Sequence, residues 1–125
     1  MAGPITSNPK VLVVDDEEKF RMLSKKNLNL RGFEVEIAEA GEEAIAKIYN
    51  FEPKVVLLDV MMPRLTGDEL VKMITDWKPG IQVIMVTANL SPEAEEECLR
   101  NGAYMYIKKP VEFDKLAEVI KQAVI

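Results

Sequence analysis

Five short apolar runs, each followed by a stretch with helical periodicity, constrain the fold of this chain more than any other feature. The runs begin near residues 11, 33, 55, 81 and 103, so successive starts lie 22, 22, 26 and 22 residues apart. That spacing fits one strand, one helix and two short loops, and it leaves no room for hairpins. The pattern predicts a doubly wound parallel sheet with five helices on its two faces. A fragment of a βα-barrel is the alternative, which five units in so short a chain disfavour.

The runs differ in how they alternate. Val11–Val14 and Val55–Leu58 are apolar at every position, as in strands buried on both faces. Phe33, Val35 and Ile37 instead alternate with glutamates, so we expect a half-exposed strand at or near an edge of the sheet. Two more strands are expected at Ile81–Val86 and Ala103–Ile107.

Helical periodicity fills the intervals between the runs. Helices are expected over Glu17–Leu30, Gly41–Asn50, Asp68–Trp77, from Pro92 to a stop at Gly102, and over Glu112–Val124. In the first helix the expected apolar stripe is Phe20, Leu23, Asn27 and Leu30. In the third helix the residues expected to face inward are Leu70, Met73, Ile74 and Trp77.

Composition narrows the class of protein. The chain has 125 residues, 48% of them hydrophobic, which suits one compact domain over residues 9–125 after a disordered leader at residues 1–8. A formal net charge of −5 argues against non-specific nucleic-acid binding, and no apolar run is long enough to span a membrane. The chain has one cysteine, Cys98, and no histidine, which excludes a disulfide framework and metal sites built from histidines or thiolates. A cytoplasmic location is expected.

Reactive side chains follow four of the five predicted strands. Asp15 and Asp16 end the first, Asp59 the third and Thr87 the fourth, and Lys109 follows the fifth. A parallel sheet brings these strand ends to one edge, which is where ligands bind in open α/β sheets. Three clustered carboxylates resist joint ionisation, and a hard divalent cation with oxygen ligands relieves the conflict. The sequence therefore predicts a magnesium site at this edge.

A carboxylate beside magnesium can attack phosphorus, while a lysine and a hydroxyl stabilise the phosphoryl oxygens. Each of these residues has a commoner structural explanation taken alone: an acidic strand-to-helix turn, a helix cap, a solvated surface charge. Their joint occurrence at successive strand ends predicts a site that forms a covalent aspartyl phosphate.

The stretch from Lys10 to Val124 resembles a receiver domain of two-component response regulators, of the chemotaxis-regulator type. The matching motifs are Val-Val-Asp-Asp ending at Asp16, Leu-Leu-Asp-Val-Met-Met-Pro around Asp59 with Gly67, Val-Thr-Ala around Thr87, and the segment from Gly102 to Pro110. The resemblance implies a flavodoxin-like sheet in the order 2-1-3-4-5. It also implies a cis peptide bond before Pro110.

The resemblance further implies roles for single residues. Asp59 would accept a phosphoryl group from a sensor histidine kinase or a phosphotransfer protein. Asp16 and Asp59 would bind Mg²⁺ directly, Asp15 through water, and Met61 through its backbone carbonyl. Lys109 and Thr87 would contact the phosphoryl oxygens.

Signalling in this family would pass through the face made by the fourth helix, the fifth strand and the fifth helix. Tyr106 matches the family's switch aromatic and would turn inward as Thr87 moves toward the phosphate. That face could serve an output domain or a homodimer, and we expect neither nucleic-acid nor membrane binding by this domain. No turnover of a separate substrate is expected, only catalysis by the domain of its own phosphorylation and dephosphorylation.

Three other functions fit parts of the pattern. A flavodoxin-like module that binds a ligand would lack a phosphate loop, because Asp15 and Asp16 stand where that loop belongs. An aspartate-nucleophile phosphatase would need a second aspartate where Met61 stands. A scaffold receiver that never accepts phosphate is disfavoured by the intact acidic pair, threonine and lysine.

Overall fold

The sheet has the predicted number and order of strands. In the computed structural model, which describes residues 8–61, 66–88 and 91–125, five parallel strands are arranged β2-β1-β3-β4-β5. The strands are β1 (Lys10–Val14), β2 (Glu34–Ala38), β3 (Val55–Leu58), β4 (Gln82–Thr87) and β5 (Met105–Lys108). The alternating strand β2 lies at an edge, and the fully apolar strands β1 and β3 lie inside the sheet, as expected.

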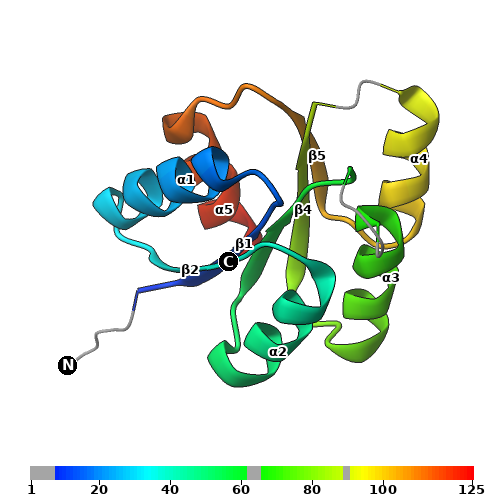
Figure 1. Cartoon of the computed structure of the whole chain (residues 1–125), viewed down its shortest axis with the longest axis horizontal. Helices are drawn as coiled ribbons and strands as arrows, with labels where there is room; N and C mark the ends of the chain where they lie inside the picture. The colour runs from blue at the N-terminus through cyan, green and yellow to red at the C-terminus, as the bar shows by residue number, and fades with distance from the viewer. Residues whose placement is uncertain (1–7, 62–65, 89–90) are drawn as a thin grey trace.

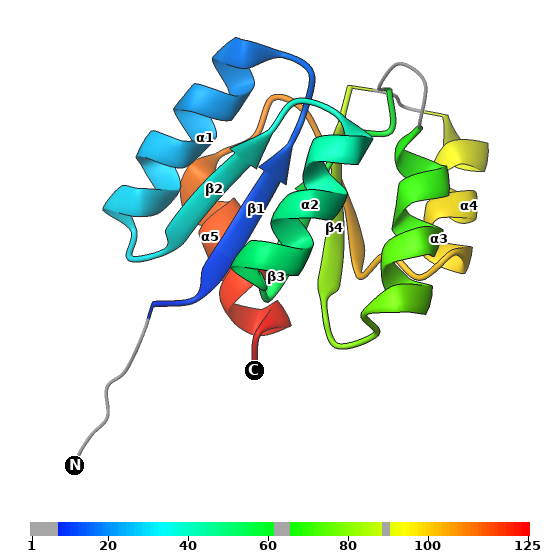
Figure 2. The same ribbon diagram turned by 60° about the horizontal axis from the view of Figure 1, so that its bottom comes forward.

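Helices cover both faces of the sheet (Figure 1, Figure 2). They are α1 (Glu18–Leu30), α2 (Gly41–Phe51), α3 (Gly67–Trp77), α4 (Pro92–Arg100) and α5 (Phe113–Ala123). Helices α1 and α5 pack on one face, and α2, α3 and α4 pack on the other. Among the described residues, no helix is long and apolar enough to cross a bilayer.

Two apolar clusters form the core, one on each face of the sheet. Leu12 and Val56 point into the cluster beneath α2, α3 and α4, whereas their neighbours Val11 and Val55 point into the cluster beneath α1 and α5. Successive strand residues alternate between faces, so a strand with helices on both sides must be apolar throughout. This explains why the two interior strands carry the most hydrophobic runs of the chain.

The predicted apolar stripe of α1 was right at Phe20 but wrong at Leu23 and Leu30. Leu23 and Leu30 are exposed, the latter by 74%, and the buried positions are Ser24 and Leu28. Phe20 precedes these two at four-residue spacing and packs against the same cluster. Neighbouring stripes of a helix differ by a rotation of about 100° around its axis, which is one residue. The spacing of apolar residues alone therefore did not decide which stripe of α1 faces the sheet.

The inner face of α3 was predicted only in part. Leu70 and Ile74 are fully buried as expected, but Met73 and Trp77 are more than two-fifths exposed and Val71 takes their place in the core. Helix α3 packs against both the sheet and α4, so the buried side of α3 includes Val71.

The ends of α4 follow their sequence signals. The Ser91 hydroxyl accepts a hydrogen bond from the Ala94 amide (3.3 Å), Pro92 is the first helical residue, and Gly102 after the helix has φ +114°. The Lys109–Pro110 peptide bond is cis, as the resemblance implied. Residues 1–7 of the predicted leader lie outside the described residues, as do Met62 and Pro63.

Candidate functional site

The sheet itself positions the candidate residues. Beyond the last ladder pair of each strand, the Asp15 amide donates to the Ala38 carbonyl (3.1 Å) and the Asp59 amide to the Val14 carbonyl (3.2 Å). At the carboxyl ends of β4 and β5, the amide of Lys109 donates to the carbonyl of Thr87 (2.8 Å). Backbone hydrogen bonds therefore hold Asp15, Asp59 and Lys109 at the carboxyl edge, as the sequence predicted.

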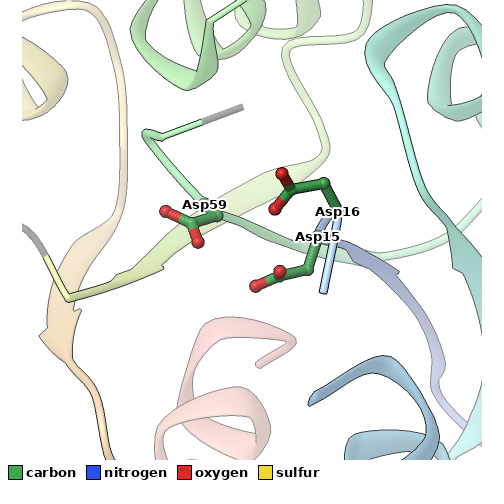
Figure 3. Close-up of side chains that lie close together, drawn as sticks. All are labelled: Asp15, Asp16 and Asp59. Atoms are coloured by element: carbon green, nitrogen blue, oxygen red, sulfur yellow. The ribbon is translucent and has the colours of Figure 1, made fainter. Parts of the chain in front are cut away.

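Asp15, Asp16 and Asp59 form an acidic cluster at this edge (Figure 3). One carboxylate oxygen of each lies within 4.8 Å of the others. Asp15 and Asp59 are buried, whereas Asp16 is exposed. Burying two carboxylates side by side costs free energy unless positive charge is supplied. The geometry therefore favours cation binding.

Lys109 supplies part of that charge. Its Nζ lies 2.6 Å from Asp15 Oδ2, 3.1 Å from Asp59 Oδ2 and 3.7 Å from Glu17 Oε1. Burial by itself lowers the pKa of the Lys109 ammonium, but the hydrogen bond to Asp15 and the charges of the two aspartates outweigh it and raise that pKa. Lys109 thus stays charged and bridges the acceptor candidate to the acidic pair.

The positive charge of Lys109 does not fully offset the burial of the Asp15 carboxylate. Burial raises the pKa of the Asp15 carboxyl above its usual range, although hydrogen bonds from Lys109 and from the Glu17 amide (2.9 Å) act in the opposite direction. Arg21 also donates to the backbone carbonyl of Asp15 (2.8 Å) from the first turns of α1. The sequence analysis did not identify Arg21, whose only signal was a basic residue five positions after Asp16.

Asp59 is bonded at both carboxylate oxygens. Oδ1 accepts the Met61 amide (2.9 Å) and Oδ2 faces Lys109. The chain returns to this point at Gly67, whose amide donates to the Val60 carbonyl (3.1 Å). A Cβ at Gly67 would lie 2.3 Å from the Asp59 carbonyl oxygen, so only glycine fits behind the acceptor candidate.

Thr87 and Tyr106 lie on β4 and β5. Thr87 is fully buried at the carboxyl end of β4, where it pairs with Lys108 of β5. Tyr106 is half-buried and packs against the cluster beneath α2, α3 and α4. Burial raises the pKa of the Tyr106 hydroxyl, with smaller contributions from Cys98, Glu95 and Asp59. Tyr106 therefore lies on the face of the sheet that α2, α3 and α4 cover.

The donor set fits magnesium. Three carboxylates offer hard oxygen ligands, and neither histidine nor a thiolate joins them in the described part of the chain. One exposed carboxylate, Asp16, leaves an open side for water ligands, which magnesium retains. An ionised Asp59 carboxylate next to a lysine and a divalent cation can act as a nucleophile toward phosphorus.

Known proteins share both sequence and fold with this chain. The family model described as "Response regulator receiver domain" matches residues 11–121. Regulatory protein AtoC of Escherichia coli is 33% identical over 95% of this chain, and the transcriptional regulatory protein PhoP of Bacillus subtilis is 39% identical over 82%. A CheY-like receiver domain structure from Methanospirillum hungatei has a TM-score of 0.90 at 37% identity, covering 94% of both chains.

AtoC and PhoP are both longer than this chain. The matched region spans 26% of AtoC and 43% of PhoP, so the likeness concerns one domain of each. The family match, the sheet order and the relatives agree over nearly the whole chain. The chain belongs to the response regulator receiver domains of two-component systems, the phosphorylation-dependent switches of these signalling pathways.

Proposed function

We propose that Asp59 is the phosphoryl acceptor of this receiver domain, which comprises residues 9–125. One observation carries the proposal: Asp59 is a buried carboxylate at the end of the central strand, with Lys109 Nζ at 3.1 Å and two further aspartates beside it. This arrangement combines a nucleophile, a fixed positive charge and a place for a divalent cation. It also disfavours a scaffold without phosphorylation, in which this costly clustering of charge would have no use.

The expected donor is a phosphohistidine of a sensor kinase or a phosphotransfer protein, the usual partners of receiver domains. An oxygen of Asp59 forms a bond to phosphorus while the bond from phosphorus to the imidazole nitrogen breaks, and that nitrogen keeps the electron pair. Lys109 and Thr87 contact the transferred phosphoryl oxygens. The hydrogen bond from the Met61 amide to Asp59 Oδ1 holds the carboxylate in a fixed orientation.

Receiver domains typically bind Mg²⁺ in an acidic pocket. Here Asp16 and Asp59 would bind it directly, Asp15 through water, and Met61 through its backbone carbonyl. When bound, the ion withdraws negative charge from the phosphoryl oxygens in the transition state. Lys109 remains necessary because it supplies the positive charge on the side of Asp59 that faces β5.

The proposed output is a change of the face formed by α4, β5 and α5. Thr87 would move toward the phosphoryl group, and Tyr106 would turn inward into the space released. The partners of that face would be an output domain or a second copy of the chain, and the expected location is the cytoplasm.

Intact-mass spectrometry tests the proposal directly. The protein is incubated with acetyl phosphate and Mg²⁺, next to Asp59→Asn and to Asp76→Asn as a matched control. Asp76 is an exposed aspartate of α3 that pairs only with Lys72 among the described residues. We expect one added phosphoryl group on the parent and on the Asp76 variant, none on the Asp59 variant, and none after chelation of Mg²⁺.

Other results would change the assignment. A phosphoryl group that persists in Asp59→Asn would move the acceptor to another residue. No uptake from acetyl phosphate or from a phosphorylated histidine kinase would refute the proposed function and favour a binding or scaffold role.

A further inference from the structure

The aromatic ring of Phe20 faces the ammonium of Lys109. Lys109 Nζ lies 4.3 Å from the ring centroid, well within the range of a cation–π interaction. Phe20 comes from the first turn of α1 and Lys109 from the segment after β5, so the contact joins two elements far apart in sequence. The lysine side chain is only 14% exposed, which limits competition from water.

In the described part of the chain, the other partners of this ammonium are carboxylates. Asp15 and Asp59, at 2.6 and 3.1 Å, are the groups that the proposed function needs to hold a water of the metal ion and to attack phosphorus. A carboxylate oxygen bonded to Lys109 is less available to a cation or to phosphorus. Glu17, at 3.7 Å, is exposed and would draw the ammonium out of the site. The ring of Phe20 is the neutral partner in this set, and it competes for none of these oxygens.

We propose that Phe20 is a positioning residue that keeps the Lys109 ammonium in the site while Asp15 and Asp59 turn to the cation and to phosphorus. The inference rests on the proposed function and refines it. With acetyl phosphate as donor, an Asp59 oxygen bonds to phosphorus as the bond from phosphorus to the acetate oxygen breaks, and acetate leaves with the electron pair. Lys109 must then reach a phosphoryl oxygen, and its contact with the ring persists through that exchange.

A purely structural role for Phe20 is the competing explanation, because its ring also packs against the core cluster beneath α1 and α5. Phe113 provides a matched control: it is half-buried, packs against the same cluster, and faces no cation among the described residues. Phe20→Leu and Phe113→Leu therefore remove the same atoms from the same cluster, but only the first removes the π face from Lys109.

The first experiment measures the initial rate of phosphorylation by acetyl phosphate at saturating Mg²⁺. We expect Phe20→Leu to slow it roughly 2- to 30-fold, the range that a partly desolvated cation–π contact implies, and Phe20→Tyr to restore most of the rate. Phe113→Leu should leave the rate near that of the parent. Equal rates for the two leucine variants would overturn the inference.

The second experiment keeps the shape of the ring and changes its charge distribution. Phenylalanines with one, two and three ring fluorines at position 20 should lower the rate stepwise, because fluorine withdraws the negative charge from the π face. A structural role predicts a flat series. A phosphorylated parent with a flat series would refute the role of Phe20 alone, whereas a parent that takes up no phosphoryl group would refute the proposed function as well.

A double-mutant cycle tests the contact without phosphorylation. Unfolding is measured for the parent, Phe20→Leu, Lys109→Met and the double variant in metal-free buffer. We expect the two substitutions to be coupled by roughly 2- to 30-fold in the unfolding equilibrium constant. Additive effects would show that ring and ammonium do not interact, and would overturn the inference whatever the rates.

Discussion

Cys98 illustrates how burial sets the chemistry of a single residue. It lies on the inner face of α4 with no exposed surface, in the cluster that also contacts Tyr106. Burial raises the pKa of its thiol to about 11, with smaller contributions from the charges of Asp68 and Glu97. The residue therefore behaves as a small apolar side chain, as expected from its place in a helical pattern.

The raised pKa predicts a loss of stability in alkali. The thiol ionises in the unfolded chain near pH 9.0 but in the folded chain only near 11. The stabilisation of the folded state by the protonated thiol is therefore fully present below pH 9.0 and is lost as the pH rises toward 11. Relative to Cys98→Ala, the parent should lose roughly 2 to 3 kcal/mol of unfolding free energy across that range. Urea unfolding of both proteins below and above the range measures it, and a constant difference would contradict the prediction.

At the scale of elements, the return of the chain from β3 to α3 depends on Gly67. The first residue of α3 lies so close to the backbone of Asp59 and Val60 that a Cβ would overlap it, at 2.3 and 2.6 Å. Neither backbone segment can yield easily, because the Asp59 amide is held by β1 and the Gly67 amide by Val60. The glycine thus fixes the helix start against the acceptor strand.

Gly67→Ala should therefore harm both stability and function. We expect a loss of about 1 to 3 kcal/mol of unfolding free energy, the usual cost of overpacking, and slower phosphorylation because Asp59 is displaced. Gly80→Ala is the matched control, since a Cβ there has no atom within 4 Å. Denaturant unfolding and the acetyl phosphate rate measure the two effects. Equal behaviour of both variants would show that the close approach carries no constraint.

At the scale of the whole molecule, the site joins separate parts of the sheet. The acidic cluster comes from the ends of β1 and β3, and Lys109 reaches it from the segment after β5. A cation bound there interacts with residues from both the first and the middle part of the chain, and it binds only when the sheet is formed. Binding to the folded state alone raises the unfolding free energy by mass action.

Magnesium should accordingly stabilise the protein, by about 2.7 kcal/mol at a concentration one hundred times the dissociation constant. Asp16→Asn should reduce this stabilisation, because it removes a proposed ligand, whereas Asp76→Asn should retain it. Thermal unfolding with Mg²⁺ and with a chelator, at constant ionic strength, measures the effect. An unchanged midpoint in the parent would argue against a metal site in the acidic cluster.

The sequence by itself determined the order of the elements, the parallel sheet and the strand ends that carry Asp15, Asp59 and Lys109. It could do so because an interior strand must be apolar on both faces, and because parallel strands end at one edge. The caps of α4 were equally predictable, since serine, proline and glycine act through local geometry.

Only the tertiary structure decided which helix stripe faces the sheet and which further side chains, Arg21 and Phe20, reach the site. Leu30 is exposed and Ser24 is buried because packing against the sheet and α5 sets the rotation of α1, and several stripes of that helix have similar spacing. The same rotation brings Phe20 over Lys109, 89 residues later in the chain. Such contacts depend on rotations and distances between elements, which no local pattern of residues encodes.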